Sequence, residues 1–423
     1  MKRLAVHSLL ACCGIILLVL GANANVQKTF AYITYSDGQI DQYRVSSDGT
    51  FVLLTPHRPK VGGLPTRVVT DPAGRFAYVG SYEDKKIAQF RIGEDGTLSP
   101  LSPASVPVGS GLLDLTVGRS GNVLYATAKD VRGVLQFAIA EGGKLTPMVP
   151  GSVDMGSYGS RVVLHPKRPF LYVTQRTGSL TRARIGPNGG VSGAELSVTT
   201  IDGVAGFLTF TKDGNTAFAT DERHESLLQY RVKPDGRLEY VGECTYQMEV
   251  DNCCGLTTIA IDPRGHSVFV CSDIAGYIYV LNMLPNGRAE RRDSEHDYRI
   301  TRDRRLITRS QYVQNAEARM REARDKVTTT EAVARARDRA DANYAALARC
   351  RGQIAIPYSI TTGPDGAVYI LNTSGVARYA VDAHGSLVDG PWAITWPDER
   401  TPPSDGRISP PYATRLTIVN RER

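Results

Sequence analysis

Long apolar runs are almost absent from this chain of 423 residues, and the only one spans Leu9 to Leu20 near the N-terminus. No later stretch is long enough to cross a bilayer as a helix, so we expect no transmembrane segment after it. The chain also lacks a glycine-rich loop leading into a helix and a histidine and carboxylate pair at ligand spacing. These absences argue against a nucleotide loop and a metal site, and we expect no cofactor.

The first residues have the pattern of an export signal. Lys2 and Arg3 precede the apolar run, and the small-residue site Ala22-Asn23-Ala24 follows it. This order predicts a signal peptide over residues 1–24 with cleavage before Asn25. We therefore expect a periplasmic or secreted protein.

Cysteine is scarce, with seven residues, and two of them lie in the leader. Leu9-Leu10-Ala11-Cys12 resembles a lipobox, but we favour the ordinary signal peptide because lipoprotein cleavage would leave an exposed apolar stub. An oxidising compartment would permit a disulfide between Cys244 and either Cys253 or Cys254. The alternative is that some of these cysteines are buried small apolar residues.

Glycines recur in one kind of turn with a nearly constant period. The steps between successive members are 47, 47, 47, 46 and 51 residues. The members are Gly49, Gly96, Gly143, Gly190, Gly236 and Gly287, and Gly385 follows beyond an insertion. Such a period is typical of a β-propeller, in which each repeat is one four-stranded blade.

A second series of turns runs in parallel, again about one period apart except across the insertion between Gly265 and Gly366. Its members are Gly74, Gly121, Arg168, Gly214, Gly265 and Gly366. Each precedes a short aromatic or apolar strand, such as Phe76-Ala77-Tyr78-Val79 or Phe170-Leu171-Tyr172-Val173. Two turn types and three apolar segments in each period predict a four-stranded antiparallel unit.

Counting these units predicts an all-β, seven-bladed β-propeller over residues 25–423. Complete units lie near 64–109, 110–156, 157–202, 203–253, 254–287 and 352–405. The first unit, from Phe30 to about Lys60, lacks an opening strand, whereas Pro411 to Val419 looks like an opening strand with no blade after it. We expect these two ends to form one blade, which closes the ring and removes its open edges.

The motif Asp71-Pro72-Ala73-Gly74-Arg75-Phe76-Ala77-Tyr78-Val79, followed by a strand that ends in Asp-Gly-x-Leu, resembles the lactonase family of seven-bladed propellers. That family includes bacterial 6-phosphogluconolactonase and fungal muconate-cycloisomerase propellers, and the resemblance covers nearly all of the chain outside residues 1–24 and 288–351. Tyr172-Val173-Thr174-Gln175 also resembles the Tyr-Val-Thr-Asn repeat of exported propellers, which mostly bind ligands. Both resemblances imply the same fold and leave the activity open.

The first strand of each propeller blade lines the central channel, so matching places in these strands form a ring. Seven residues before each turn of the second series stand Arg67, Asp114, Arg161, Phe207, Thr258 and Ser359. The resemblance implies a working histidine in the third blade, an Arg-His pair in the fourth and an Asn-Glu pair after that blade's second strand. Here those places hold Leu113-Asp114, Ser160-Arg161 and Gln175-Arg176.

These replacements bear on catalysis, because opening a lactone needs a base that activates water and a donor that stabilises the oxyanion. Arginine stays protonated and cannot be the base. Asp114 could replace the missing histidine, while Arg161 and Arg176 would hold a substrate carboxylate or phosphate. We favour the alternative that the charged ring only hydrates the channel. The histidines His165, His224 and His266 stand outside the family's channel positions.

Asp221-Glu222-Arg223, after the second strand of the fifth blade, is a further acidic candidate, because the family carries an Asp-Arg pair there. The match is partial, and we favour a solvated, self-paired charge cluster. The candidate ligand-binding residues are thus Arg67, Asp114, Arg161, Arg176, Asp221, Glu222 and Arg223. No residue is assigned a catalytic or metal-binding role.

Residues 288–351 contain no glycine and carry 17 basic and 11 acidic residues, a surplus close to the +7 of the whole chain. The apolar spacing Val313, Ala316, Met320, Ala323 and Val327, repeated after Thr328-Thr329-Thr330, predicts a helical hairpin inserted in the sixth blade. Its narrow alanine seams suggest that it packs against a partner surface. Export argues against nucleic acid as that partner, and a solvated hairpin is the alternative.

Two functions remain open from the sequence. We favour an exported, lactonase-like propeller that binds a small anionic ligand or a protein partner through its channel face and helical insertion. The alternative is a divergent hydrolase that acts on a small anionic sugar lactone. The missing histidine and glutamate argue against catalysis, and the insertion adds surface for interaction.

Overall fold

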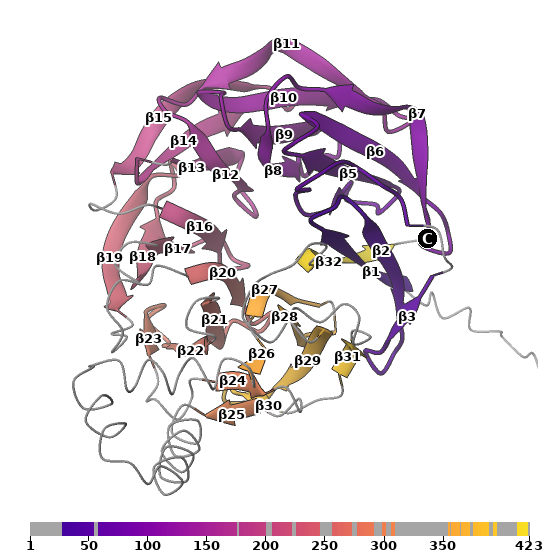
Figure 1. Cartoon of the computed structure of the whole chain (residues 1–423). Coiled ribbons are helices and arrows are strands. Elements are labelled where there is room, and N and C mark those ends of the chain that lie inside the picture. The colour runs from indigo at the N-terminus through magenta and orange to yellow at the C-terminus, as the bar shows by residue number, and fades with distance from the viewer. Residues whose placement is uncertain are drawn as a thin grey trace, which may run out of the picture.

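The computed structural model describes residues 28–54, 58–175, 177–199, 205–221, 226–245, 256–272, 277–291, 298–301, 306–308, 354–355, 357–363, 365–372, 375–388, 392–395 and 413–421. These residues form 32 β-strands, and no helix is present among them. The strands make seven antiparallel sheets around a common centre (Figure 1). The prediction of an all-β, seven-bladed propeller is thereby confirmed, whereas the export signal over residues 1–24 lies outside the described residues.

Blades two to five are each built from four consecutive strands, of which the first lies innermost. Blade two contains β4 (Val69–Thr70), β5 (Phe76–Ser81), β6 (Lys86–Ile92) and β7 (Leu98–Pro107). Blade three contains β8 (Leu112–Val117), β9 (Val123–Ala128), β10 (Gly133–Ile139) and β11 (Leu145–Asp154). Blade four contains β12 (Gly159–Leu164), β13 (Phe170–Gln175), β14 (Ser179–Ile185) and β15 (Val191–Thr199). Blade five contains β16 (Ala205–Phe210), β17 (Thr216–Asp221), β18 (Ser226–Val232) and β19 (Leu238–Thr245).

Blades six and seven follow the same order with additional strands. Blade six contains β20 (Leu256–Ile261), β21 (Ser267–Ser272), β22 (Tyr277–Met283) and β23 (Ala289–Arg291), extended by β24 (Tyr298–Thr301), β25 (Leu306–Thr308) and β26 (Ile354–Ala355). Blade seven contains β27 (Pro357–Thr362), β28 (Val368–Asn372), β29 (Gly375–Val381), β30 (Leu387–Val388) and β31 (Trp392–Thr395). The range 288–351 therefore begins with strands paired to blade six, and the expected helices from Val313 onward lie outside the described residues.

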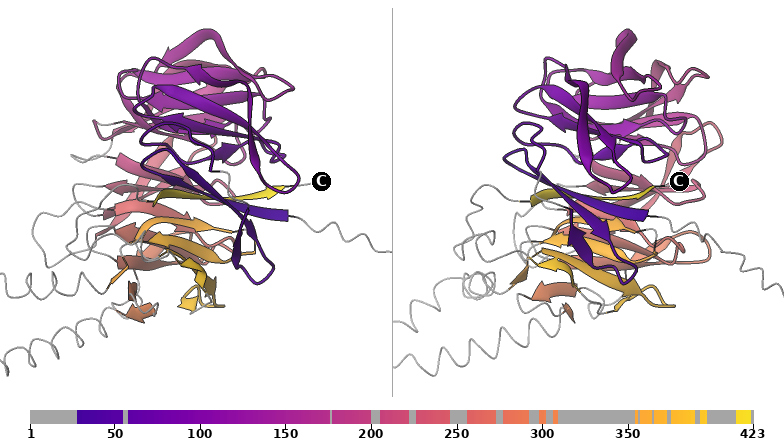
Figure 2. Two further views of the ribbon diagram at one scale, coloured as in Figure 1. Left: turned by 45° about the vertical axis from the view of Figure 1, so that its right-hand side comes forward. Right: turned by 90° about the vertical axis from the view of Figure 1, so that its right-hand side faces the viewer.

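Blade one is made from both ends of the chain, as the sequence predicted. It contains β1 (Lys28–Tyr35), β2 (Ile40–Val45), β3 (Phe51–Leu53) and, innermost, the C-terminal β32 (Ala413–Arg421). In the pairing of β1 with β32, Ala31 lies opposite Ile418. Both views of Figure 2 show the two strands side by side.

The second strand of each blade provides much of the core because it is covered on both faces by neighbouring blades. Every residue of β5, β9 and β13 is buried, and their aromatic and β-branched side chains suit such a strand. At the closing seam, Ile33 and Leu416 of blade one pack with Tyr369 and Leu371 of blade seven. This apolar seam holds the two chain ends in the ring without a covalent link.

Hydrogen bonds to the carbonyls of six turn glycines join one blade to the next. The Tyr78 hydroxyl donates to the Gly143 carbonyl at 2.7 Å, and the equivalent pairs are Tyr32–Gly96, Tyr125–Gly189 and Tyr172–Gly236. Blade five has Phe218 at this place, and the Gln229 amide donates to the Gly287 carbonyl instead. Burial raises the pKa of the Tyr125 hydroxyl to about 12, so it remains a donor at neutral pH.

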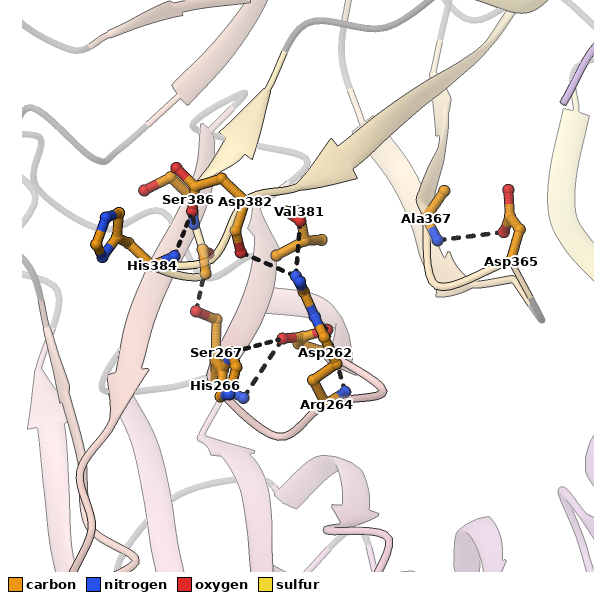
Figure 3. Close-up of polar contacts among 11 residues, drawn as sticks. Asp262, Arg264, His266, Ser267, Asp365, Ala367, Val381, Asp382, His384 and Ser386 are labelled. Atoms are coloured by element: carbon orange, nitrogen blue, oxygen red, sulfur yellow. Dashed lines mark hydrogen bonds and ion pairs between the residues drawn. The ribbon is translucent and has the colours of Figure 1, made fainter. Parts of the chain in front are cut away.

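The junction between blades six and seven uses different donors (Figure 3). Ser267 donates to the Gly385 carbonyl at 2.8 Å, and Arg264 donates to the carbonyls of Val381 at 2.6 Å and Asp382 at 2.9 Å. The same backbone carbonyl is therefore satisfied by a tyrosine, glutamine or serine according to the blade. These polar links add directional contacts to the apolar seams.

The turn glycines have left-handed backbone angles, which explains why glycine recurs at this position in each repeat. Gly96 has a φ of +90°, and a Cβ atom there would lie 2.2 Å from the Phe30 ring. One member of the predicted series is wrong. The fourth-blade turn uses Gly189, with a φ of +82°, in place of Gly190, because the turn closes through a bond from the Gly186 N–H to the Gly190 carbonyl.

Candidate functional site

The ring positions expected from the sequence occupy equivalent places on the innermost strands, which surround the centre in Figure 1. Arg67 lies just before β4, and the others are Asp114 in β8, Arg161 in β12, Phe207 in β16, Thr258 in β20 and Ser359 in β27. Each lies near the start of its strand. The ring therefore lies towards the end of the propeller axis where the second strands of the blades end.

A β-bulge marks this place in successive blades. The pairing of β8 with β9 shifts by one residue between Leu112 and Asp114, and that of β12 with β13 shifts between Gly159 and Arg161. Equivalent shifts occur in β16, β20, β27 and β32. A bulge changes the direction of the side chains that follow it, so the repeated bulge sets how the ring side chains are presented.

Threonine hydroxyls satisfy backbone groups that the bulges remove from the strand pairing. The N–H of Arg161 donates to Thr174 Oγ1 at 3.1 Å, and the N–H of Phe207 donates to Thr220 Oγ1 at 2.8 Å. Thr174 in turn donates to the Gly206 carbonyl of the next blade at 3.3 Å. These bonds fix the backbone on which the ring side chains stand.

Asp114 is buried, with a side chain that is 5% exposed, and both carboxylate oxygens are engaged. Oδ1 lies 3.5 Å from Nε of Arg67 in blade two, and Oδ2 accepts a hydrogen bond from the Val162 N–H in blade four at 3.2 Å. Asp114 thus links three consecutive blades. Neighbouring groups cover this carboxylate, so Asp114 itself is little exposed to solvent, whereas the Arg67 side chain is 44% exposed.

Thr258 in blade six makes the same inter-blade bond as Asp114. Its Oγ1 accepts a hydrogen bond at 3.2 Å from the N–H of Ile360, which follows the ring position of blade seven. Val162 likewise follows the ring position of blade four. Because a neutral hydroxyl performs this task in one blade, the bond needs an acceptor and not an acid.

Arg161 contacts the ring position of the following blade. The central carbon of its guanidinium lies 4.4 Å from the centroid of the Phe207 ring, which is a cation–π arrangement. The contacts Arg67–Asp114 and Arg161–Phe207 show that side chains at neighbouring ring positions reach one another. The structure therefore brings Arg67, Asp114 and Arg161 into one arc over blades two to four.

The seventh ring position, which the sequence analysis missed, is Arg415. In β32 the pairing shifts between Ala413 and Arg415, so Arg415 stands directly after the bulge, as Asp114 does in β8. Turn counting missed it because no turn of the second series follows β32 in the sequence. Aligning Arg415-Leu416-Thr417 with Asp114-Leu115-Thr116 would have found it.

Three of the remaining candidates, Arg176, Glu222 and Arg223, lie outside the residues that the structure describes. The cysteines Cys253 and Cys254 lie outside them as well. Asp221 ends β17 and is 2% exposed, so it is not the solvated residue that we expected. Its backbone lies opposite Ala205 of β16 and Ser226 of β18.

His165 has a structural role in the turn between β12 and β13. Its Nδ1 accepts hydrogen bonds from the N–H groups of Lys167 and Arg168, and its Nε2 lies 2.9 Å from the Gly214 carbonyl. Burial lowers its pKa below the ordinary value, so the ring is neutral. Asp71 caps the equivalent turn of blade two through the N–H groups of Arg75 and Phe76.

Within the described part of the chain, no three His, Cys, Asp or Glu side chains gather in a way that could hold a metal ion. The described residues also include no helix that is long and apolar enough to cross a membrane.

Comparison with known proteins gives a match at the level of structure. No family model and no curated protein matches the sequence. A solved protein from Lactobacillus plantarum superposes with a TM-score of 0.64 at 16% identity, and the match covers 93% of this chain and 99% of that one. A protein assigned as a 6-phosphogluconolactonase from Bacteroides uniformis gives 0.65 at 15% identity, with the same coverage. The chain has the fold of the lactonase-type propellers.

The periplasmic gluconolactonase of Pseudomonas aeruginosa is a third example of this fold. It superposes with a TM-score of 0.62 at 15% identity, over 93% of this chain and 99% of its own. Identities this low establish a shared lactonase-type fold and say nothing about a shared reaction. The function must therefore be argued from the channel ring.

Proposed function

We propose that this protein is an exported, lactonase-like propeller that binds a small anionic ligand at the channel ring and does not hydrolyse it. The observation that carries the proposal is the engagement of Asp114, the only acidic residue among the seven ring positions. Its two oxygens serve Arg67 and the Val162 N–H. A general base must reach a water molecule, and this buried carboxylate serves blade packing instead.

The arginines support ligand binding. Arg67 and Arg161 flank Asp114 on the channel ring, and the Arg67 side chain is 44% exposed. A guanidinium donates up to five hydrogen bonds in a planar fork that fits a carboxylate or a phosphate. Two guanidinium groups beside one carboxylate give this part of the ring a positive charge, which favours an anionic ligand.

The location and the partner surface belong to the same proposal. The N-terminal pattern supports export to the periplasm or beyond, and one protein of the same fold is named a periplasmic gluconolactonase. The basic insertion over residues 288–351 would add a second surface, for an anionic protein partner. A divergent lactone hydrolase, in which Asp114 acts as base, is the alternative.

Calorimetric titration of the mature protein with 6-phosphogluconate tests the binding proposal. Replacing Arg161 with glutamine should weaken binding about tenfold or more, because one charge-assisted hydrogen-bonding fork is lost. The matched control is Arg91→Gln, since Arg91 is exposed on β6 and lies 5.2 Å from the Phe76 ring in a similar cation–π contact. Equal loss in both variants, or none in either, would contradict an anion site at the ring.

A further inference from the structure

The charged residues of the channel ring all lie on one side of it. Its members on blades one to four are Arg415, Arg67, Asp114 and Arg161, so three cations and one anion lie on four consecutive blades. Phe207, Thr258 and Ser359 make the other three positions uncharged. The positive surplus thus lies on one arc, and one of its three cations comes from the closing strand β32.

Arg415 and Arg67 stand at neighbouring ring positions. A direct bond joins their two strands beside the ring: Thr417 Oγ1, two residues after Arg415, donates to the carbonyl of Val68 at 2.9 Å. Val68 immediately follows Arg67. Arg67 and Arg161 each contact the ring residue of the following blade. The ring residue of the blade that follows Arg415 is Arg67, so the same arrangement would direct Arg415 towards Arg67.

We propose that Arg415 is the third arginine of the anion site, and that a small dianion of the phosphate class bound there ties the closing strand β32 to blade two. This inference rests on the proposed function, since it requires an anion at the ring. An anion that contacts both guanidinium groups is attracted by both positive charges. Ligand binding and ring closure would therefore be coupled.

The coupling follows from how the ring is closed. β32 is held by its pairing with β1, by the apolar seam around Leu416 and by the Thr417 bond. A ligand that contacts Arg415 and Arg67 binds only when β32 is in place. Any ligand that binds the closed form alone stabilises it in proportion to its occupancy. Phosphate should therefore protect the C-terminal strand from opening.

The experiment uses the full mature chain and inorganic phosphate, with chloride at matched ionic strength as the reference. Phosphate should raise the melting temperature of the unmodified protein and slow amide hydrogen exchange in residues 413–421. In Arg415→Gln the phosphate Kd should rise about tenfold or more, and the phosphate-induced thermal shift should be lost. Arg91→Gln is again the control, because Arg91 is exposed on β6, and it should behave as the unmodified protein.

The outcomes separate this inference from the function on which it rests. If Arg67→Gln and Arg161→Gln weaken phosphate binding while Arg415→Gln leaves it unchanged, the closing strand has no part in the site and only the inference fails. If no ring variant alters phosphate binding, the ring is not an anion site and both fail. Should Arg415→Gln not fold, exchange in the unmodified protein decides, because phosphate without effect on residues 413–421 overturns the coupling.

Discussion

Replacing Asp114 with alanine should destabilise the propeller by about 1–3 kcal/mol, the usual cost of leaving a buried hydrogen-bonding group unsatisfied. The group left behind is the Val162 N–H, which loses its 3.2 Å bond to Asp114 Oδ2. The ion pair with Arg67 adds little, because the Arg67 side chain is 44% exposed and solvent screens it. Nearly all of the loss should therefore come from the link between blades three and four.

Asp114→Thr separates this packing role from a need for charge. Thr258 makes the equivalent bond to the Ile360 N–H with a hydroxyl at 3.2 Å, so a threonine at position 114 should restore most of the stability that alanine loses. Thr258→Val, which removes the acceptor in blade six, is the matched comparison and should cost a similar amount. Urea unfolding followed by fluorescence measures all three variants.

Two results would refute this reasoning. If Asp114→Ala were as stable as the unmodified protein, the bond to Val162 would not support the ring. If Asp114→Thr were as unstable as Asp114→Ala, the carboxylate charge itself would be required. Either result would revive Asp114 as a residue kept for chemistry.

Three further predictions concern other parts of the fold. Tyr78→Phe should cost about 1 kcal/mol or more in urea unfolding, because the Gly143 carbonyl loses its donor; unchanged stability would show that the tyrosine links are dispensable. The pKa of His165 is lowered by burial, so its contribution to stability is complete above about pH 6.5 and is lost as the pH falls below it. The stability difference between the unmodified protein and His165→Asn should therefore shrink from pH 7.5 to pH 5, and a constant difference would contradict this. Replacing residues 309–350 by a Gly/Ser linker should leave a folded propeller with a similar melting temperature by circular dichroism, because the described strands of blade six end before residue 309 or resume after residue 353; failure to fold would make the insertion structural.

The architecture was readable from the sequence because its determinants are local and repeated. A turn that needs a left-handed residue selects glycine, so Gly96 and Gly143 record the period directly. Ring closure was readable because Pro411 to Val419 resembles an opening strand and stands alone. The error at Gly190 arose where two adjacent glycines offered the same signal.

The site was readable only in part, because its meaning depends on contacts between blades. Counting back from turns found Asp114 and Arg161, yet nothing local reveals that Asp114 accepts a bond from Val162, which lies 48 residues further along the chain. Arg415 escaped because its strand has no turn after it. The bulges that present these side chains are properties of strand pairing and leave no mark in composition.

The most direct test of the account is to follow the opening of 6-phosphogluconolactone in the samples in which binding of 6-phosphogluconate is measured. The central claim is that the channel ring binds an anion without catalysing hydrolysis. It predicts binding that Arg161→Gln weakens, together with ring opening no faster than the spontaneous rate. Opening well above the spontaneous rate in the unmodified protein, lost in a folded Asp114→Thr variant, would contradict it.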